Sequence, residues 1–74
     1  MIELKSFSDT LSGLQAKMQE YIENGAILGF LIDRNNRTVH IYRPGRSPEV
    51  LEHPEAVSGD SELPGFVLQM AKIW

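Results

Sequence analysis

The chain has 74 residues, of which 42% are apolar and 23% are charged, and its seven Lys and Arg against ten Asp and Glu give a net charge of −3. This composition is too apolar for a disordered chain, and it lacks the long apolar run that a membrane span requires. We therefore expect one globular domain over residues 1–74 with no membrane association.

The N-terminal segment predicts a strand followed by an amphipathic helix. Residues 2–5 read as a short strand in which Glu3 and Lys5 share one side. Residues 8–10, with the sequence Ser-Asp-Thr, offer side-chain oxygens that can cap a helix. Apolar residues then recur at helical spacing from Leu11 onward, until Asn24 and Gly25 end the pattern.

The middle of the chain predicts an antiparallel hairpin. Residues 26–32 are a nearly continuous apolar run, residues 33–36 suit a turn, and residues 38–42 resume a strand pattern. We expect the first strand to be buried on both faces. In the second strand, Val39 and Ile41 share the face that meets the core. The opposite face, on which we expect more water, carries Thr38, His40 and Tyr42.

The last third of the chain predicts short elements joined by loops. Residues 49–52 read as a short strand between two prolines, which suits the edge of a sheet. Residues 54–62 read as a polar loop with a turn at 58–60. Residues 66–70 fit a last strand or the start of a helix, and we favour the strand.

Several fragments, in this order along the chain, resemble a bacterial protein family: Glu3-Leu4-Lys5-Ser6, Ser8-Asp9, Lys17 with Tyr21 and Gly25, Leu31-Ile32-Asp33, and Leu63-Pro64-Gly65-Phe66. The family is the Uma family of putative restriction endonucleases, within the PD-(D/E)XK nuclease superfamily. The resemblance covers only the C-terminal part of the family's domain. It implies an α+β chain with the C-terminal half of a restriction-endonuclease-like fold: strand, helix and hairpin with one or two further short strands.

The resemblance also implies a catalytic site that works with Mg²⁺ or Mn²⁺. Glu3 matches the family's metal-binding Glu, and Lys5 stands at the usual position of the catalytic cation. Lys17 matches a helical Lys that can serve as that cation. The family's strand Asp, which precedes the Glu, and its acidic upstream helix have no counterpart in a sequence that begins at Met1. Because phosphodiester hydrolysis of this type needs two or three carboxylates around the metal, we expect a shortened relative that is inactive as a single chain.

The same residues also have purely structural interpretations. Glu3 and Lys5 suit a solvated pair on an edge strand, and Lys17 suits a boundary position where its stem covers apolar surface. Asp33 follows a buried strand, where its side chain can hold a turn by bonding to nearby backbone amides. We expect His40 and His53 to be ordinary surface residues and not zinc ligands.

Partners follow from size and composition. A chain this short buries only about 60% of its unfolded surface, and without Cys it has no disulfide, so we expect a homodimer. The alternative to a nuclease relative is a non-enzymatic interaction module that forms a homodimer or adds to the sheet of a full-length relative.

Two further groups of residues bear on contact with DNA. DNA contact is the weaker expectation, because acidic residues lie close to the one basic concentration, which comprises Arg34, Arg37, Arg43 and Arg46. The aromatic residues suit a core or an interface more than base stacking: Tyr21, Phe30, Phe66 and Trp74. The N-terminus has no basic region followed by an apolar stretch, which indicates a cytoplasmic protein.

Overall fold

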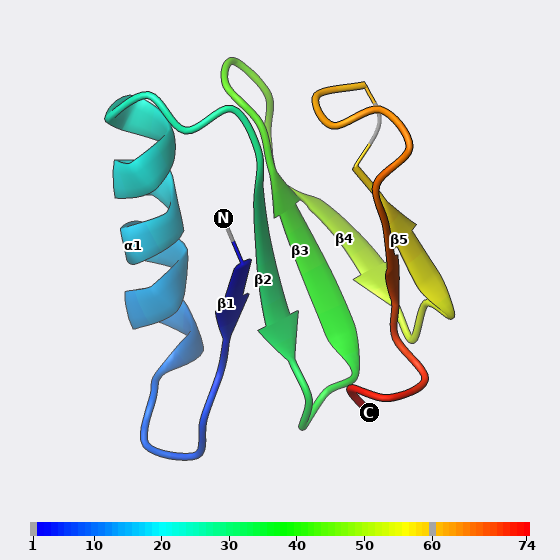
Figure 1. Cartoon of the computed structure of the whole chain (residues 1–74). Coiled ribbons are helices and arrows are strands. Elements are labelled where there is room, and N and C mark those ends of the chain that lie inside the picture. The colour runs from blue at the N-terminus through cyan, green and yellow to red at the C-terminus, as the bar shows by residue number, and fades with distance from the viewer. Residues whose placement is uncertain (1, 60) are drawn as a thin grey trace.

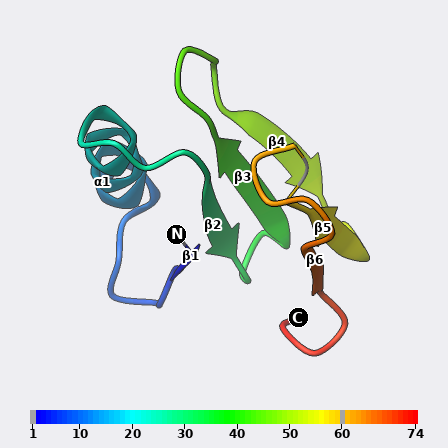
Figure 2. The ribbon, with the colours of Figure 1, turned by 45° about the horizontal axis from the view of Figure 1, so that its top comes forward.

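One helix and six strands form three layers in the part of the chain that the computed structural model describes, residues 2–59 and 61–74 (Figure 1). The middle layer is a sheet with the order β1-β2-β3-β4, made of Ile2–Leu4, Gly29–Asp33, Thr38–Tyr42 and Glu49–Glu52. Helix α1, Leu11–Glu23, covers one face of this sheet. The other face packs against β5, Ala56–Ser58, and β6, Val67–Gln69, which form a second sheet (Figure 2). The α+β class expected from the sequence is confirmed.

The first three elements form a parallel strand-helix-strand unit. Strand β1 pairs in parallel with β2, so that Glu3 lies opposite Leu31 in the register, and the backbone N–H of Lys5 continues the pairing by donating to the carbonyl of Ile32 at 2.9 Å. Parallel neighbours need a crossover connection, and α1 supplies it. Strand β2 then pairs with β3 as an antiparallel hairpin, as predicted.

Helix α1 begins and ends where the sequence indicates. The Thr10 hydroxyl accepts a hydrogen bond from the backbone N–H of Gly13 at 3.1 Å, which satisfies one of the free amides of the first turn. Asn24 closes the helix, and Gly25 follows with φ of +107°, a conformation that glycine tolerates best. Within the described residues, no helix has the length and apolar character needed to cross a bilayer.

The continuous apolar run of β2 is explained by cover on both sides. Toward the helix, Leu31 packs with Leu14, Met18 and Tyr42. On the opposite face a larger cluster contains Leu28, Phe30, Ile32, Val39, Ile41, Val57 and Met70. The prediction that this strand is buried on both faces is therefore confirmed.

The expectation of a wetter face on β3 is wrong. Tyr42 and His40 on that face are only 3% and 8% exposed, because α1 and the side chains beneath it cover β3 as well as β2. His40 is consequently a buried residue and not the surface histidine that the sequence predicted. His53 lies on the surface, as predicted.

The C-terminal third contains one strand that the sequence did not predict. Strand β4 lies at the edge of the main sheet and β6 is a strand, and both agree with expectation. The expected polar loop over 54–62 instead contains β5, which pairs with β6 and buries Val57 in the core. The turn expected at 58–60 falls partly outside the described residues, since Asp60 is not described, and Ser58 belongs to β5.

Candidate active site

Glu3 lies on the face of β1 that is turned toward the helix. It stands opposite Leu31 in the parallel register, and Leu31 packs beneath α1 beside Leu14 and Met18. Neighbouring strands of a sheet direct paired residues to the same face. The Glu3 side chain is half-buried, with 24% of its surface exposed. The strand therefore delivers one carboxylate to the space between sheet and helix.

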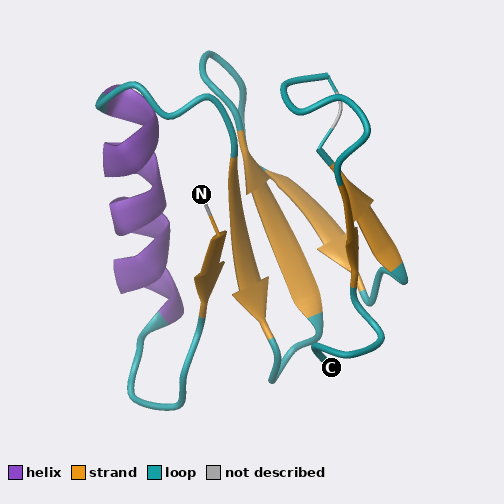
Figure 3. Ribbon diagram, in the orientation of Figure 1, coloured by secondary structure: helices purple, strands orange, loops and turns teal. Residues whose placement is uncertain are grey.

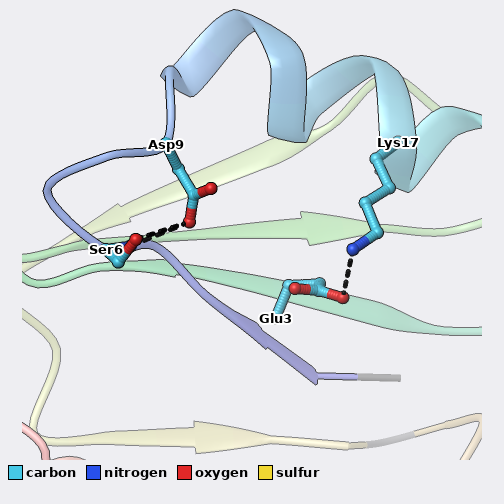
Figure 4. Close-up of polar contacts among 4 residues, drawn as sticks. All are labelled: Glu3, Ser6, Asp9 and Lys17. Carbon is cyan, nitrogen blue, oxygen red and sulfur yellow. Dashed lines mark hydrogen bonds and ion pairs between the residues drawn. The ribbon is translucent and has the colours of Figure 1, made fainter.

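Lys17 comes from α1 and meets this carboxylate. Its Nζ lies 3.0 Å from Oε1 of Glu3 (Figure 4) and 5.7 Å from the ring centre of Tyr21, one turn further along the helix. The hydrogen bond to Glu3 raises the pKa of Lys17 above its ordinary value, and the contact with Tyr21 adds to the effect. The ammonium is therefore held in its charged form beside Glu3. Two residues that the family resemblance assigned to one site are thus in direct contact.

Lys5 shares the helix-facing side of β1 with Glu3 but does not join the pair. Its Nζ makes only a long contact of 3.5 Å with the carbonyl oxygen of Ser6, and within the described residues it forms no ion pair. It lies near enough to Asp33 and Asp9 for its charge to help lower the pKa of each. Lys5 thus acts on Asp33 and Asp9 and stays outside the Glu3–Lys17 pair.

Asp9 is a second carboxylate near the two lysines, and the sequence indicated it as a candidate helix cap and as part of the Ser8-Asp9 fragment of the family resemblance. Its Oδ2 accepts hydrogen bonds from the backbone N–H and the hydroxyl of Ser6, at 3.1 and 2.9 Å (Figure 4). These bonds, followed by the charges of Lys17 and Lys5, lower the pKa of Asp9. The cap itself is Thr10. The signal for Asp9 in the sequence is the Ser-x-x-Asp spacing in a loop that leads into a helix.

Asp33 holds the turn between β2 and β3, as predicted. Its side chain is fully buried and accepts hydrogen bonds from the backbone N–H of Asn35 and of Asn36, at 3.1 and 3.3 Å, and from Nδ2 of Asn36 at 2.8 Å. Burial alone raises the pKa of this carboxyl, but the bonds from Asn36, with the charge of Lys5 and the Asn35 amide, outweigh it and the pKa is lowered. Both oxygens are committed, which leaves none directed at Glu3.

The donor set does not fit a complete divalent-metal site. Mg²⁺ and Mn²⁺ are bound by several oxygen ligands in near-octahedral geometry, in hydrolytic sites usually from more than one carboxylate. Among the described residues no group of three or more acidic or histidine side chains comes together. The one carboxylate that matches the family ligand, Glu3, already contacts an ammonium.

The arginines that the sequence grouped together do not form one patch. Arg43 is held by Glu62 at 2.9 Å and Glu49 at 3.7 Å, which neutralises its charge. Arg34 and Arg37 line a cleft at the end of the sheet where Lys5 also lies. The sequence could not indicate that the arginines are separated, because their separation depends on the tertiary arrangement of the β2–β3 hairpin and the segments packed around it.

Comparison with known proteins places this geometry in context. The model of a protein family described as putative restriction endonuclease, Uma2, matches residues 1–71. A putative nuclease belonging to DUF820 from Anabaena variabilis ATCC 29413 superposes with a TM-score of 0.70 at 29% sequence identity. The match covers 78% of this chain and 32% of that nuclease, so this chain spans about a third of its length. No curated protein matches the chain. The structural likeness confirms the nuclease-like fold that the sequence predicted.

Proposed function

The chain belongs to the family of putative restriction endonucleases, and from this premise we propose that it is a shortened relative of a metal-dependent DNA endonuclease that does not hydrolyse DNA as a single chain. The family implies dependence on Mg²⁺ or Mn²⁺. In this chain Glu3 is the residue that corresponds to the metal ligand, and Lys5 and Lys17 are the corresponding cations. The proposal is that these residues form an incomplete centre.

The observation that carries the proposal is the contact between Glu3 and Lys17. An ammonium 3.0 Å from the carboxylate occupies the position next to the oxygen that a metal ion would need. A dication there would have to displace that ammonium or be repelled by its charge. Asp33 cannot assist, because its oxygens hold the turn. A single carboxylate that an ammonium already engages disfavours a divalent ion.

The chemistry follows from this charge balance. Hydrolysis of a phosphodiester requires a water whose pKa is lowered well below that of bulk water, and bound metal ions do this in nucleases of this type. The Glu3 carboxylate already accepts from Lys17, and the nearby Asp9 carboxylate accepts from Ser6. The arrangement supports charge neutralisation and positioning, but it does not support activation of a nucleophile.

A plasmid cleavage assay tests the proposal. Supercoiled plasmid is incubated with the purified chain in millimolar Mg²⁺ or Mn²⁺, beside Glu3→Gln and, as a matched control, Glu23→Gln at the exposed end of α1. We expect all three proteins to leave the plasmid intact. Cleavage that disappears in Glu3→Gln and persists in Glu23→Gln would contradict the proposal, because it would make Glu3 a working catalytic ligand.

A second candidate function is a non-enzymatic interaction module, and the exposed edge of β1 favours it. Strand β1 is outermost in the sheet, and the apolar side chains of Ile2 and Leu4 are each 49% exposed. An outer strand with free backbone groups and apolar side chains is a template for an added strand. The partner would be a second copy of this chain or a full-length relative, which would also be the source of a further carboxylate beside Glu3.

Sedimentation across a wide range of concentration tests this second candidate. We expect self-association that Leu4→Lys weakens, whereas Val50→Lys serves as the control because Val50 is 50% exposed on β4, at the opposite edge of the sheet. A monomer at every concentration would exclude the homodimer. Titration with a full-length relative, read by the same method, would then decide whether any partner adds to β1.

A further inference from the structure

A cleft of about 420 Å³ opens at the end of the sheet where the chain leaves β1 and where β2 turns into β3. Its walls come from residues 4–7, from the turn that contains Arg34 and Arg37, and from Trp74. Figure 3 shows that the β1–α1 loop, the β2–β3 turn and the C-terminal segment lie at the same end of the molecule. Clefts of roughly 300–1,000 Å³ are the usual size for small ligands. The space therefore suits a small molecule or the end of a larger one.

The charged side chains that line this cleft all have the same sign. Lys5, Arg34 and Arg37 line it, and no Asp or Glu among the described residues does so. These are three of the seven basic residues of a chain whose net charge is −3. Neither arginine forms an ion pair within the described part of the chain, and Asp33, which precedes Arg34 in the chain, is buried and committed to the turn. Unpaired guanidinium groups facing a common space favour an anion, and phosphate matches their donor geometry.

The turn that presents the arginines is held firmly. Asp33 accepts hydrogen bonds from the amides of Asn35 and Asn36. On the other side, the backbone N–H of His53 donates to the carbonyl of Arg37 at 2.6 Å, and Arg37 keeps a φ of +52°, which is uncommon for a residue other than glycine. A turn fixed at both ends loses little freedom when a ligand binds, and this lowers the cost of binding.

Two aromatic side chains complete the lining. Phe7 is 93% exposed, an unusual position for a large apolar side chain unless something covers it. Trp74 is half-buried, and its Nε1 donates to the carbonyl of Pro54 at 3.2 Å, which fixes the indole ring. Aromatic rings interleaved with cations are the arrangement on which nucleobases stack. This interleaving joins residues 5, 7, 34, 37 and 74, so it exists only in the folded chain.

We propose that this cleft binds a nucleotide through a terminal phosphate. The phosphate contacts Arg34, Arg37 and Lys5, and the base stacks against Phe7 or Trp74. The volume admits about one nucleotide, so the ligand is a free mononucleotide or the phosphorylated end of a strand. The site needs no metal ion and does not include Glu3 or Lys17, although it shares Lys5 with the site of the proposed function.

Trp74 is the one tryptophan of the chain, and its fluorescence therefore reports on the cleft directly. The whole chain is titrated with AMP, with excitation beyond the absorption of adenine. We expect a saturable change that the double substitution Arg34→Gln/Arg37→Gln weakens at least about tenfold. Arg46→Gln removes the same charge from an exposed arginine outside the cleft and should leave the affinity within about twofold. Matching thermal unfolding curves verify that the double variant is folded.

Three further ligands define the chemistry. Adenosine and inorganic phosphate should each bind at least about tenfold more weakly than AMP, because each supplies only one of the two contacts. A trinucleotide with a 5′-phosphate that equals AMP assigns the cleft to strand ends, and a trinucleotide that fails to bind assigns it to free mononucleotides. The proposal is overturned by the absence of a saturable change with AMP, by phosphate binding as tightly as AMP, or by equal losses in Arg46→Gln and the double variant.

Discussion

The turn that Asp33 holds gives the sharpest prediction for stability. Asp33→Ala removes three hydrogen bonds at once, those from the amides of Asn35 and Asn36 and from Nδ2 of Asn36. A hydrogen bond contributes about 0.5–1.5 kcal/mol, so three of them together contribute about 1.5–4.5 kcal/mol. Because Asn35 and Asn36 are exposed, water can reach their freed donors. No buried group is therefore left unsatisfied, and the loss should be about 2 kcal/mol, near the lower end of the range.

This loss should be large enough to measure. A domain of this length has a free energy of unfolding of about 4–11 kcal/mol, and a loss of 2 kcal/mol lowers the melting temperature by about 8–16 °C. Thermal and urea unfolding followed by circular dichroism give both quantities. Asp33→Asn keeps one oxygen that can accept from the backbone amides, but its own NH₂ group faces Nδ2 of Asn36 and cannot accept from it. The loss of stability in Asp33→Asn should therefore be smaller than in Asp33→Ala.

The pH dependence separates the charged hydrogen bonds from simple loss of packing. The pKa of Asp33 is lowered in the folded chain, so the stability it contributes is complete above its unfolded pKa of about 3.9 and is lost as the pH falls through the lower folded value. The difference in unfolding free energy between the wild type and Asp33→Ala should therefore shrink between about pH 5 and pH 2. A difference that is constant over this range, or a melting temperature unchanged at pH 7, would refute the reasoning.

Three other substitutions test the remaining elements. Met18→Ala leaves a cavity at a fully buried position between α1 and the sheet, and it should reduce the free energy of unfolding by about 2–5 kcal/mol in urea titrations. A loss below about 1 kcal/mol would contradict the packing of α1 on β2. Thr10→Ala removes the N-cap and should cost about 1 kcal/mol by the same measurement, whereas an unchanged stability would mean that the cap is not formed. Lys17→Gln frees the carboxylate of Glu3, so calorimetry should detect tighter Mn²⁺ binding than in the wild type or in the control Lys72→Gln, and equal affinities in all three would show that the ammonium does not compete.

Much of the fold could be predicted because its signals are local. The cap at Thr10, the helical spacing and Gly25 define α1, and the apolar run of β2 requires cover on both faces. The burial of His40 could not be predicted, because it depends on which face of the hairpin the helix covers. Strand β5 was missed for a related reason. It has three residues with one apolar side chain, Val57, and becomes a strand by pairing with β6.

The candidate site was accessible only through a family resemblance. Glu3 and Lys17 lie in different elements, and nothing in their spacing requires contact; the parallel pairing of β1 with β2 and the crossover of α1 bring them together. The hydrogen bonds that Asp9 accepts from Ser6 depend on the path of the loop before the helix. The cleft is lined by residues from near both ends of the described chain, Lys5 and Trp74, so a sequence pattern could not reveal it.

The carboxyl ¹³C resonance of Glu3 reports whether this carboxylate is held by Lys17 or belongs to a complete metal site. With the chain labelled at glutamate, the resonance is followed while Mg²⁺ is added to millimolar concentration. We expect the Glu3 resonance to shift no more than that of the exposed carboxylate of Glu23. A saturable shift confined to Glu3 would contradict this expectation, because that shift would show a divalent ion bound where the structure has an ammonium.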